Sequence, residues 1–473
     1  MNFRHDNRIL RIPASFLGLP LLLLLMAQTS WAFPISNPKT RRITRHPAFW
    51  NVAQHYNNQR PFTTSSRLCA AATNDNDNGD GDTTATEIEI VDRSTLSLLE
   101  HINFNIPSQE LAVPFYYDIL GCGVDPRMAS NFVLQDDDDD ETKEPDLDST
   151  IWANCGASQF HLCYNHQTSA TIPGRVGLRY DNLDGLEQRL NAEVMSVLTE
   201  AAAYDDENNK DAKEPHKQCF QSYMQERDSQ GNPQITVVDR YNNIFVCRQV
   251  NDTSLPSTSA VTAFKQPIIS SKDNNEDPIV TKLAQRYGRP DQTECRGIDY
   301  VEIPVQPEQA EQIAAFYEGV FDATTFVVHQ TPMLGLPDTV SHLKIAMIAL
   351  GNIQANGRAD QYLLFQEVEE QPSSTSSSQP QPQVLPAGYH HLALYVGEST
   401  KDFDQAYKNA DLAGVIWINP RFADKVDTLA KAKLEHQFRF KNIVDLETGD
   451  VLLELEHEIR SIEHPSWPGH YGK

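Results

Sequence analysis

The chain repeats one pattern of secondary structure four times, and this repetition limits the folds that it can adopt. Each unit opens with a strand of alternating apolar residues, continues with an amphipathic helical stretch and closes with further strands. The opening strands are HINFNI from His101, RVGLRY from Arg175, YVEIPV from Tyr300 and HLALYV from His391. Each places its second, fourth and sixth residues on one apolar face. The sequence therefore predicts an α+β fold of four modules, each with one strand, one helix and several strands.

Segments without apolar periodicity divide the chain. The lack of apolar periodicity at 251–281 predicts a linker there, between a first domain at 95–250 and a second domain at 290–468. With 473 residues, the chain is long enough for two or three domains with sizeable cores. The acidic run at 136–148 is expected to be a solvated loop insertion, since it lacks the spaced oxygens and the glycine of a calcium loop.

The N-terminal residues have the composition of targeting sequences. Residues 1–32 combine arginines with a leucine-rich run too short to span a bilayer, which predicts a signal peptide. Residues 33–85 carry basic and hydroxyl residues without an acid before Asp75, and end in a polar spacer expected to be disordered. A signal peptide followed by a transit peptide starting at Phe33 resembles the bipartite plastid-targeting sequence of algae with complex plastids. We expect a plastid protein without a transmembrane segment in its mature form, and secretion is the alternative.

The composition favours a small ligand or a basic partner over a nucleic acid. A net charge of -26 argues against general nucleic-acid binding, because phosphates would be repelled by most of the surface. Seven cysteines without a CxxC pair predict neither a disulfide framework nor a zinc site. Walker, Rossmann, nucleophile-elbow and HExxH patterns are absent from the sequence.

The opening strands, together with the segments FYYDILG, FYEGVF and DLETGDVLLELEHE, resemble the vicinal oxygen chelate superfamily. This superfamily includes glyoxalase I, bleomycin-resistance proteins and extradiol dioxygenases. The resemblance covers Thr95 to Ile459 apart from the insertions. It implies that the four βαβββ modules pair into two domains. Each domain would be a curved sheet with helices on its convex side and a ligand or metal cavity on its concave side.

The resemblance also implies which residues face each cavity. In the first domain, the family's four metal positions fall on His101, His161, Arg175 and Val246. Only two of these can bind a metal, and the cation of Arg175 disfavours a divalent ion, so we expect this domain to be metal-free. His101, His161 and Arg175 would instead suit an anionic ligand such as a carboxylate. The alternative is that these polar residues meet solvent on an open sheet face.

In the second domain, the corresponding positions are Tyr300, a residue near Gln366, His391, and Glu454 or Glu456. Dioxygenases of the family hold Fe(II) with two histidines and one glutamate. Here Tyr300 stands in place of the first histidine, and the preceding Asp299 needs a bulge to reach the cavity. We expect His391, Glu454 and Glu456 to be metal ligands or catalytic groups, and Tyr300 and Gln366 to contact the ligand.

These residues lead to two functional hypotheses. The first is a protein that binds a small oxygen-rich metabolite, with metal-assisted isomerase, lyase or dioxygenase chemistry in the second domain and Fe, Mn, Ni or Zn as the divalent cofactor. The alternative is a non-catalytic module that sequesters or senses a metabolite. Arg421 and Arg439 are expected near the rim of the second cavity, and His457, His464 and His470 are candidate supplementary ligands.

Overall fold

The computed structural model describes thirteen stretches of the chain: 90–132, 149–156, 158–164, 171–204, 216–228, 231–249, 278–287, 293–329, 343–354, 358–369, 383–384, 391–420 and 425–467. The predicted targeting segments, the acidic run and most of the linker lie outside these residues. Arg421 and His470 also lie outside them. Among the described residues, no helix is both long enough and apolar enough to cross a membrane.

All four predicted modules are present, and in each the first and last strands are parallel neighbours. The four pairs are β2 (Leu96–Ile106) with β5 (Ser158–Tyr164), β6 (Arg175–Tyr180) with β9 (Ile244–Gln249), β10 (Cys295–Val305) with β13 (Ala359–Glu367), and β15 (His391–Val396) with β17 (Val451–Ser461). Parallel neighbours need a crossover connection, which the helix of each module provides. The predicted α+β fold class is confirmed.

The inner strands complete the modules. They are β3 (Gly123–Val124) and β4 (Thr150–Cys155), β7 (Phe220–Arg227) and β8 (Pro233–Asp239), β11 (Thr325–Val328) and β12 (Ile345–Gln354), and β16 (Gln437–Val444). Two short strands, β1 (Ile90–Arg93) and β14 (Gln383–Val384), pair with β12 and β17.

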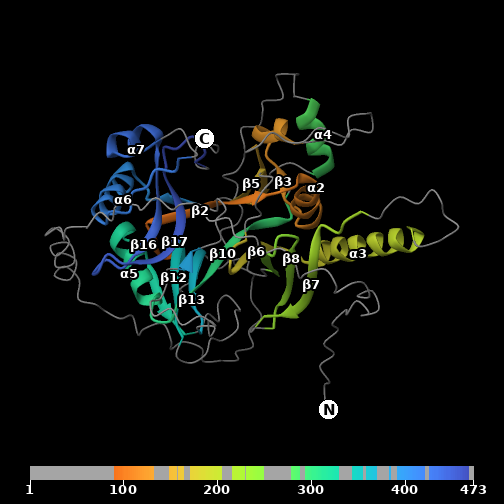
Figure 1. Ribbon diagram of the computed structural model, residues 1–473, viewed down its shortest axis with the longest axis horizontal. Helices are drawn as coiled ribbons and strands as arrows, with labels where there is room; N and C mark the ends of the chain where they lie inside the picture. Colours follow the sequence, from red (N-terminus) through yellow and green to blue (C-terminus); the bar gives the residue numbers. More distant parts are fainter. Residues whose placement is uncertain are drawn as a thin grey trace, which may run out of the picture.

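The strands form two mixed sheets (Figure 1). The nine-stranded sheet has the order β1-β12-β13-β10-β6-β9-β8-β7, with β11 paired to β12. The eight-stranded sheet has the order β14-β17-β15-β2-β5-β4-β3, with β16 paired to β17. At the centre of each sheet, two opening strands run antiparallel: β10 with β6, and β15 with β2.

This topology corrects the expected pairing of the modules. We expected the first module to pair with the second inside 95–250, and the third with the fourth inside 290–468. The first module instead joins the fourth through β2 and β15, and the second joins the third through β6 and β10. Among the described strands, neither range therefore forms a sheet by itself. The apolar alternation fixes which face of a strand is buried, but it does not choose the strand's neighbour.

Helices cover the apolar faces of the sheets. The first module has α2 (Gln109–Val113), which continues into the π-helix η2 (Pro114–Ile119), and the 3-10 helix η3 (Pro126–Asn131). The other helices are α3 (Asp184–Tyr204), α4 (Pro278–Tyr287), α5 (Ala310–Phe321), α6 (Thr400–Leu412) and α7 (Leu429–Glu435). Helices α5 and α6 pack against each other, while the C-terminal part of α3 extends away from the body (Figure 1).

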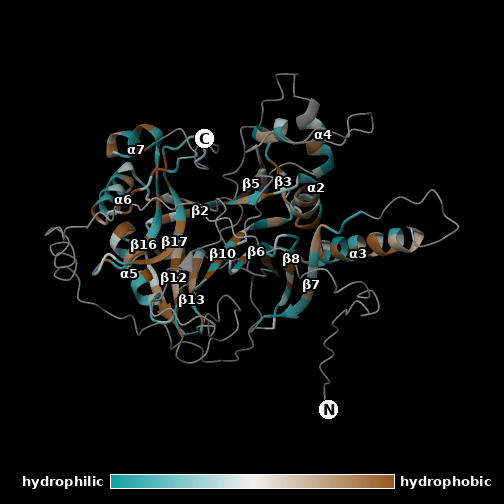
Figure 2. Cartoon of the chain, in the orientation of Figure 1, coloured by the Kyte–Doolittle hydropathy of each residue, from teal (hydrophilic) through white to brown (hydrophobic). Residues whose placement is uncertain are grey.

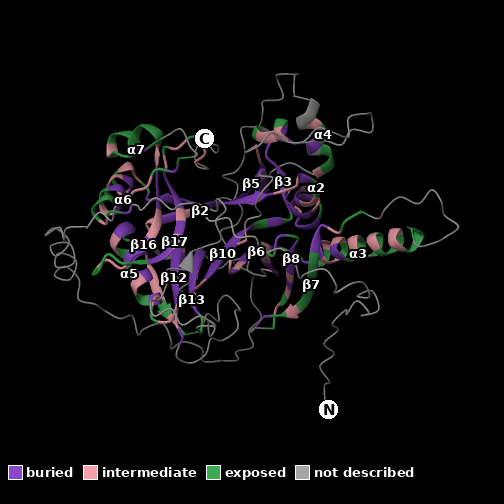
Figure 3. Ribbon diagram, viewed as in Figure 1, coloured by how far each residue is buried: buried purple, intermediate pink, exposed green. Residues whose placement is uncertain are grey.

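The core confirms the predicted faces of the opening strands. Ile102 and Phe104 of β2, and Leu392 and Leu394 of β15, are at most 1% exposed and belong to the main apolar cluster. Figure 2 shows that apolar and polar residues alternate along the strands, and Figure 3 shows that the central strands are largely buried while α3, α6 and α7 carry exposed residues. Burying one such side chain contributes about 1.5–3 kcal/mol, so the apolar alternation is sufficient to fix the orientation of each strand.

Two β-bulges lie at equivalent places in β2 and β10. His101 pairs with Ala393 and Leu99 with Leu394, which leaves Glu100 as the extra residue. In β10 the pairing is likewise irregular between Ile298 and Tyr300, at Asp299. A bulge redirects the side chain of the inserted residue. The bulge that Asp299 needed to reach the polar face is therefore present.

Candidate metal centre

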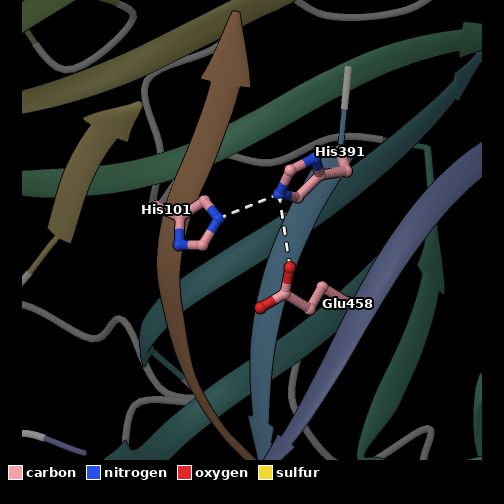
Figure 4. A group of neighbouring side chains, drawn as sticks. All are labelled: His101, His391 and Glu458. Carbon is pink, nitrogen blue, oxygen red and sulfur yellow. Dashed lines mark hydrogen bonds and ion pairs between the residues drawn. The ribbon is translucent and has the colours of Figure 1, made fainter. Parts of the chain in front are cut away.

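Two histidines from opposite ends of the chain meet in the eight-stranded sheet. His101 on β2 and His391 on β15 lie on neighbouring antiparallel strands, and their Nε2 atoms are 3.0 Å apart (Figure 4). Both residues are buried, on the faces of their strands opposite the apolar core. The contact depends on the pairing of the first module with the fourth, because β2 and β15 would otherwise belong to different sheets.

Glu458 adds a carboxylate to the two imidazoles. It lies on β17, which pairs with β15, and its Oε2 is 3.5 Å from Nε2 of His391 (Figure 4). The three ligand atoms all lie within 4.8 Å of one another. Metal–nitrogen bonds of about 2.1 Å place adjacent ligand atoms about 3.0–3.4 Å apart in octahedral or tetrahedral geometry. The separations of 3.0 Å between the two imidazoles and 3.5 Å between His391 and Glu458 are close to this range, which makes the three residues candidate ligands of one divalent ion.

The histidines are in the protonation state that a metal ligand needs. Burial, followed by the Arg439 guanidinium, holds the pKa of His391 well below its usual range. Burial also lowers the pKa of His101, although the neighbouring Glu100 carboxylate partly opposes this effect. Both imidazoles are consequently neutral near pH 7, with a nitrogen lone pair available to a metal.

The carboxylate of Glu458 is held in place by two arginines. It accepts hydrogen bonds from Arg439 and Arg460, and Arg460 also bonds to Glu100. Burial alone would raise the pKa of Glu458, but the two guanidiniums outweigh burial and hold it well below its usual range. With Glu456, the cluster contains three carboxylates and two guanidiniums. The residual negative charge favours a bound cation.

Glu456 lies beside this group and has different properties. It pairs in register with His391, and its Oε1 accepts hydrogen bonds from Asn419 at 2.9 Å and Arg439 at 3.2 Å. Burial raises the pKa of Glu456, whereas its neighbour Glu458 has a lowered pKa. Two carboxyl groups in one site with opposite pKa shifts can divide their roles, one staying ionised and the other exchanging a proton.

His161 lies beside His101, but its Nε2 atom points to Gln159 rather than to the other candidate ligands. It stacks on His101 with ring centroids 3.6 Å apart, and on Trp152 with centroids 4.4 Å apart. Its Nε2 is 3.0 Å from Oε1 of Gln159. His161 thus fixes the plane of the His101 ring, which orients the Nε2 atom of His101 toward His391.

The other residues predicted from sequence lie outside this group. Glu454 pairs with Lys441 at 2.8 Å and has a side chain that is 39% exposed. Arg175, Tyr300 and Gln366 belong to the nine-stranded sheet, where Arg175 forms an ion pair with Glu302 at 2.8 Å. The predicted division between a metal-free first domain and a metal-binding second domain therefore does not match this site, which takes one histidine from each.

The structure also locates Arg439 and His457, which the sequence analysis named as a rim residue and a candidate supplementary ligand. Arg439 contacts Glu456 and Glu458 directly. His457 lies on the apolar face of β17, where its Nε2 is 2.7 Å from the Tyr317 hydroxyl and its ring stacks on Phe440. His457 is therefore a core residue rather than a ligand.

His464, which follows β17, lies near the site. Its ring centroid is 6.3 Å from that of Tyr395, a residue of β15 on the same face as His391. Burial and the Arg460 guanidinium lower the pKa of His464 to about 3.

No protein-family model and no curated protein matches the sequence. Solved structures that match the chain include glyoxalase I from Zea mays, with 12% identity and a TM-score of 0.39 over 78% of this chain and 93% of that chain. The fosfomycin resistance protein FosX from Listeria monocytogenes has 13% identity and a TM-score of 0.19, over 35% of this chain and 90% of that chain. At these identities, the chemistry has to be inferred from this chain's own side chains.

Proposed function

We propose that the chain is a metal-dependent enzyme of the vicinal oxygen chelate type that acts on a small oxygen-rich metabolite. The observation that carries the proposal is the convergence of His101, His391 and Glu458 from three adjacent strands. Two histidines and one carboxylate form a donor set used for Fe(II), and imidazole also suits Zn and Ni. We therefore propose Fe, Mn, Ni or Zn as the cofactor.

The neighbouring residues support proton-transfer chemistry. A divalent ion in this site would supply a Lewis acid that polarises adjacent oxygens of a substrate. Arg439 and Arg460 keep Glu458 ionised and fix its position as a ligand. Glu456, with its raised pKa, is the group suited to take a proton from a carbon next to a carbonyl and return it. This division of roles favours an isomerase or a lyase.

The experiment is a calorimetric titration of the full chain with Fe(II), Mn(II), Ni(II) and Zn(II) in turn, combined with elemental analysis of the purified protein. We expect one ion per chain for at least one metal, and loss of that binding in Glu458→Gln. Glu454→Gln is the matched control, because it makes the same chemical change on the same strand outside the three-residue group. Equal binding by both variants would contradict the assignment of Glu458.

A second function is favoured by one observation. Both oxygens of Glu458 already accept hydrogen bonds from arginines, so the cluster is held together without a metal. The corresponding proposal is a non-catalytic module that binds a metabolite. Co-purification of a small molecule with the chain, without stoichiometric metal, would support this second function and exclude the first.

We also propose that residues 1–85 direct the protein to a plastid. The support is their composition alone: a basic and leucine-rich start followed by a basic segment without acids before Asp75. Fusion of residues 1–85 to a fluorescent protein, expressed in an alga with complex plastids, tests this proposal. Fluorescence in the medium rather than in the plastid would indicate secretion instead.

A further inference from the structure

The nine-stranded sheet contains a position-by-position counterpart of the candidate metal centre. In both sheets, an opening strand has an acidic residue at a β-bulge and pairs antiparallel with a second opening strand, which pairs parallel with a closing strand. These strands are β2, β15 and β17 in one sheet, and β10, β6 and β9 in the other. The registers of the two sheets match. In the eight-stranded sheet, His101 pairs with Ala393, which pairs with Glu458. In the nine-stranded sheet, Tyr300 pairs with Gly177, which pairs with Val246. By the same register, Arg175 takes the place of His391.

The framework around the two sites is shared, although the candidate ligands are not. In the eight-stranded sheet, the bulged Glu100 bonds to Arg460 on the closing strand. In the nine-stranded sheet, the bulged Asp299 contacts Arg248 on the closing strand at 3.4 Å. Tyrosine, arginine and valine at the three ligand positions cannot hold a divalent ion, so this site needs a different ligand.

The second site contains buried hydrogen-bond donors without acceptors among the described residues. These donors are the hydroxyl of Tyr300, Nε of Arg248 and Nη2 of Arg179. Tyr300 is 0% exposed and Arg248 is 7% exposed. A buried donor without a partner destabilises a fold, and such groups in native proteins usually have a ligand, an ion or a water that accepts from them.

Two of the three donors belong to arginines that contact one buried carboxylate, that of Asp299. Asp299 immediately precedes Tyr300, and its Oδ1 is 2.8 Å from Nε of Arg179. Arg179 and Arg248 are direct neighbours on paired strands. Each of these two guanidiniums therefore contacts Asp299 through one nitrogen and has another N–H group that can donate to a second acceptor. Arg248 also contacts Asp228 at 3.2 Å, and Arg175 is paired with Glu302.

One side of Tyr300 is apolar. Its ring lies on Gly177, where a Cβ atom would come within 2.2 Å of the ring. It also belongs to a second apolar cluster that includes Val246, Met347 and Leu364. This cluster is separate from the main core and lies on the same side of the sheet as Tyr300. The site thus combines cationic donors with an adjacent buried apolar cluster.

We propose that this site binds a small organic carboxylate, independently of any metal. Its oxygens accept from Tyr300, Arg179 and Arg248, and its apolar part packs on the second apolar cluster. Guanidinium groups favour an oxyanion over a neutral acceptor, because charged hydrogen bonds are roughly twice as strong. The apolar cluster favours an organic carboxylate over inorganic phosphate.

The test is thermal denaturation and calorimetry of the full chain with benzoate, using benzamide and inorganic phosphate as comparison ligands. We expect saturable binding of benzoate and a rise in the melting temperature, without either effect for benzamide or phosphate. Tyr300→Phe should weaken benzoate binding by about tenfold, because one hydrogen bond is lost. Tyr116→Phe is the matched control, since its hydroxyl is also buried and without a partner among the described residues. It should leave benzoate binding unchanged.

The proposal is separated from the metal centre by two further measurements. Addition of EDTA, and the variant His101→Ala, should both leave benzoate binding unchanged. The proposal is overturned if benzoate does not bind, if Tyr300→Phe binds it as tightly as the wild type, or if EDTA or His101→Ala abolishes binding. Tighter binding of phosphate than of benzoate would also overturn it, because the site would then be a general anion site.

Discussion

Arg460 lies between two buried carboxylates, and its replacement measures how strongly the candidate metal centre depends on charge balance. Its guanidinium bonds to Glu100 and Glu458, whose side chains are 1% and 3% exposed. Arg460→Met keeps most of the side-chain volume and removes the charge. Removing one partner of a buried ion pair costs about 3–5 kcal/mol, because an uncompensated charge stays buried. We expect a loss of this size in the free energy of unfolding.

Urea denaturation of the full chain, followed by tryptophan fluorescence and circular dichroism, measures this loss. Arg296→Met is the control, because Arg296 pairs with Asp181 on the surface, where the two side chains are 44% and 68% exposed. That variant should lose less than about 1 kcal/mol. A divalent ion should restore part of the stability of Arg460→Met, since it replaces the missing positive charge between the carboxylates. A loss below about 1 kcal/mol in Arg460→Met would refute the reasoning.

Three further predictions follow from the described contacts. His391→Ala should abolish metal binding in calorimetry and change the melting temperature only slightly. His457→Ala should keep metal binding and lower the melting temperature, because His457 packs against Phe440. Glu454→Gln should change the free energy of unfolding by less than about 1 kcal/mol, because its ion pair is partly exposed; a larger change in urea denaturation would contradict this. Burial raises the pKa of Asp239 to about 6, so the folded state binds its proton more tightly than the unfolded state does. The stability from this proton is complete below about pH 4 and is lost as the pH rises through 6, by up to about 3 kcal/mol relative to Asp239→Asn; parallel pH profiles for the two proteins would contradict it.

The sequence was sufficient to predict the modules because apolar alternation sets the orientation of each strand. The predicted strands starting at Arg175 and His391 coincide with β6 and β15. The partner of each opening strand could not be predicted in this way. All four strands have the same apolar face, and hydrogen bonding along a strand edge is independent of side-chain type. The contact between His101 and His391 was therefore missed, although both residues were identified as facing the ligand.

The third candidate ligand was missed for a related reason. Glu454, Glu456 and Glu458 share one face of β17, so alternation cannot distinguish among them. The pairing register of β17 with β15 distinguishes the three glutamates. Glu456 pairs with His391, and Glu458 pairs with Ala393. The bulge at Glu100, which brings a carboxylate to Arg460, also depends on pairing and has no signature in the sequence.

The central claim is that one metal ion is held jointly by the first and the fourth module. Calorimetric titration of His101→Ala with the metal that the wild-type chain binds tests this claim most directly. Circular dichroism and the melting temperature establish that the variant is folded. We predict that His101→Ala loses stoichiometric binding, as His391→Ala does, because each removes one of the two imidazoles that lie 3.0 Å apart. Undiminished binding of one ion by folded His101→Ala would contradict the account.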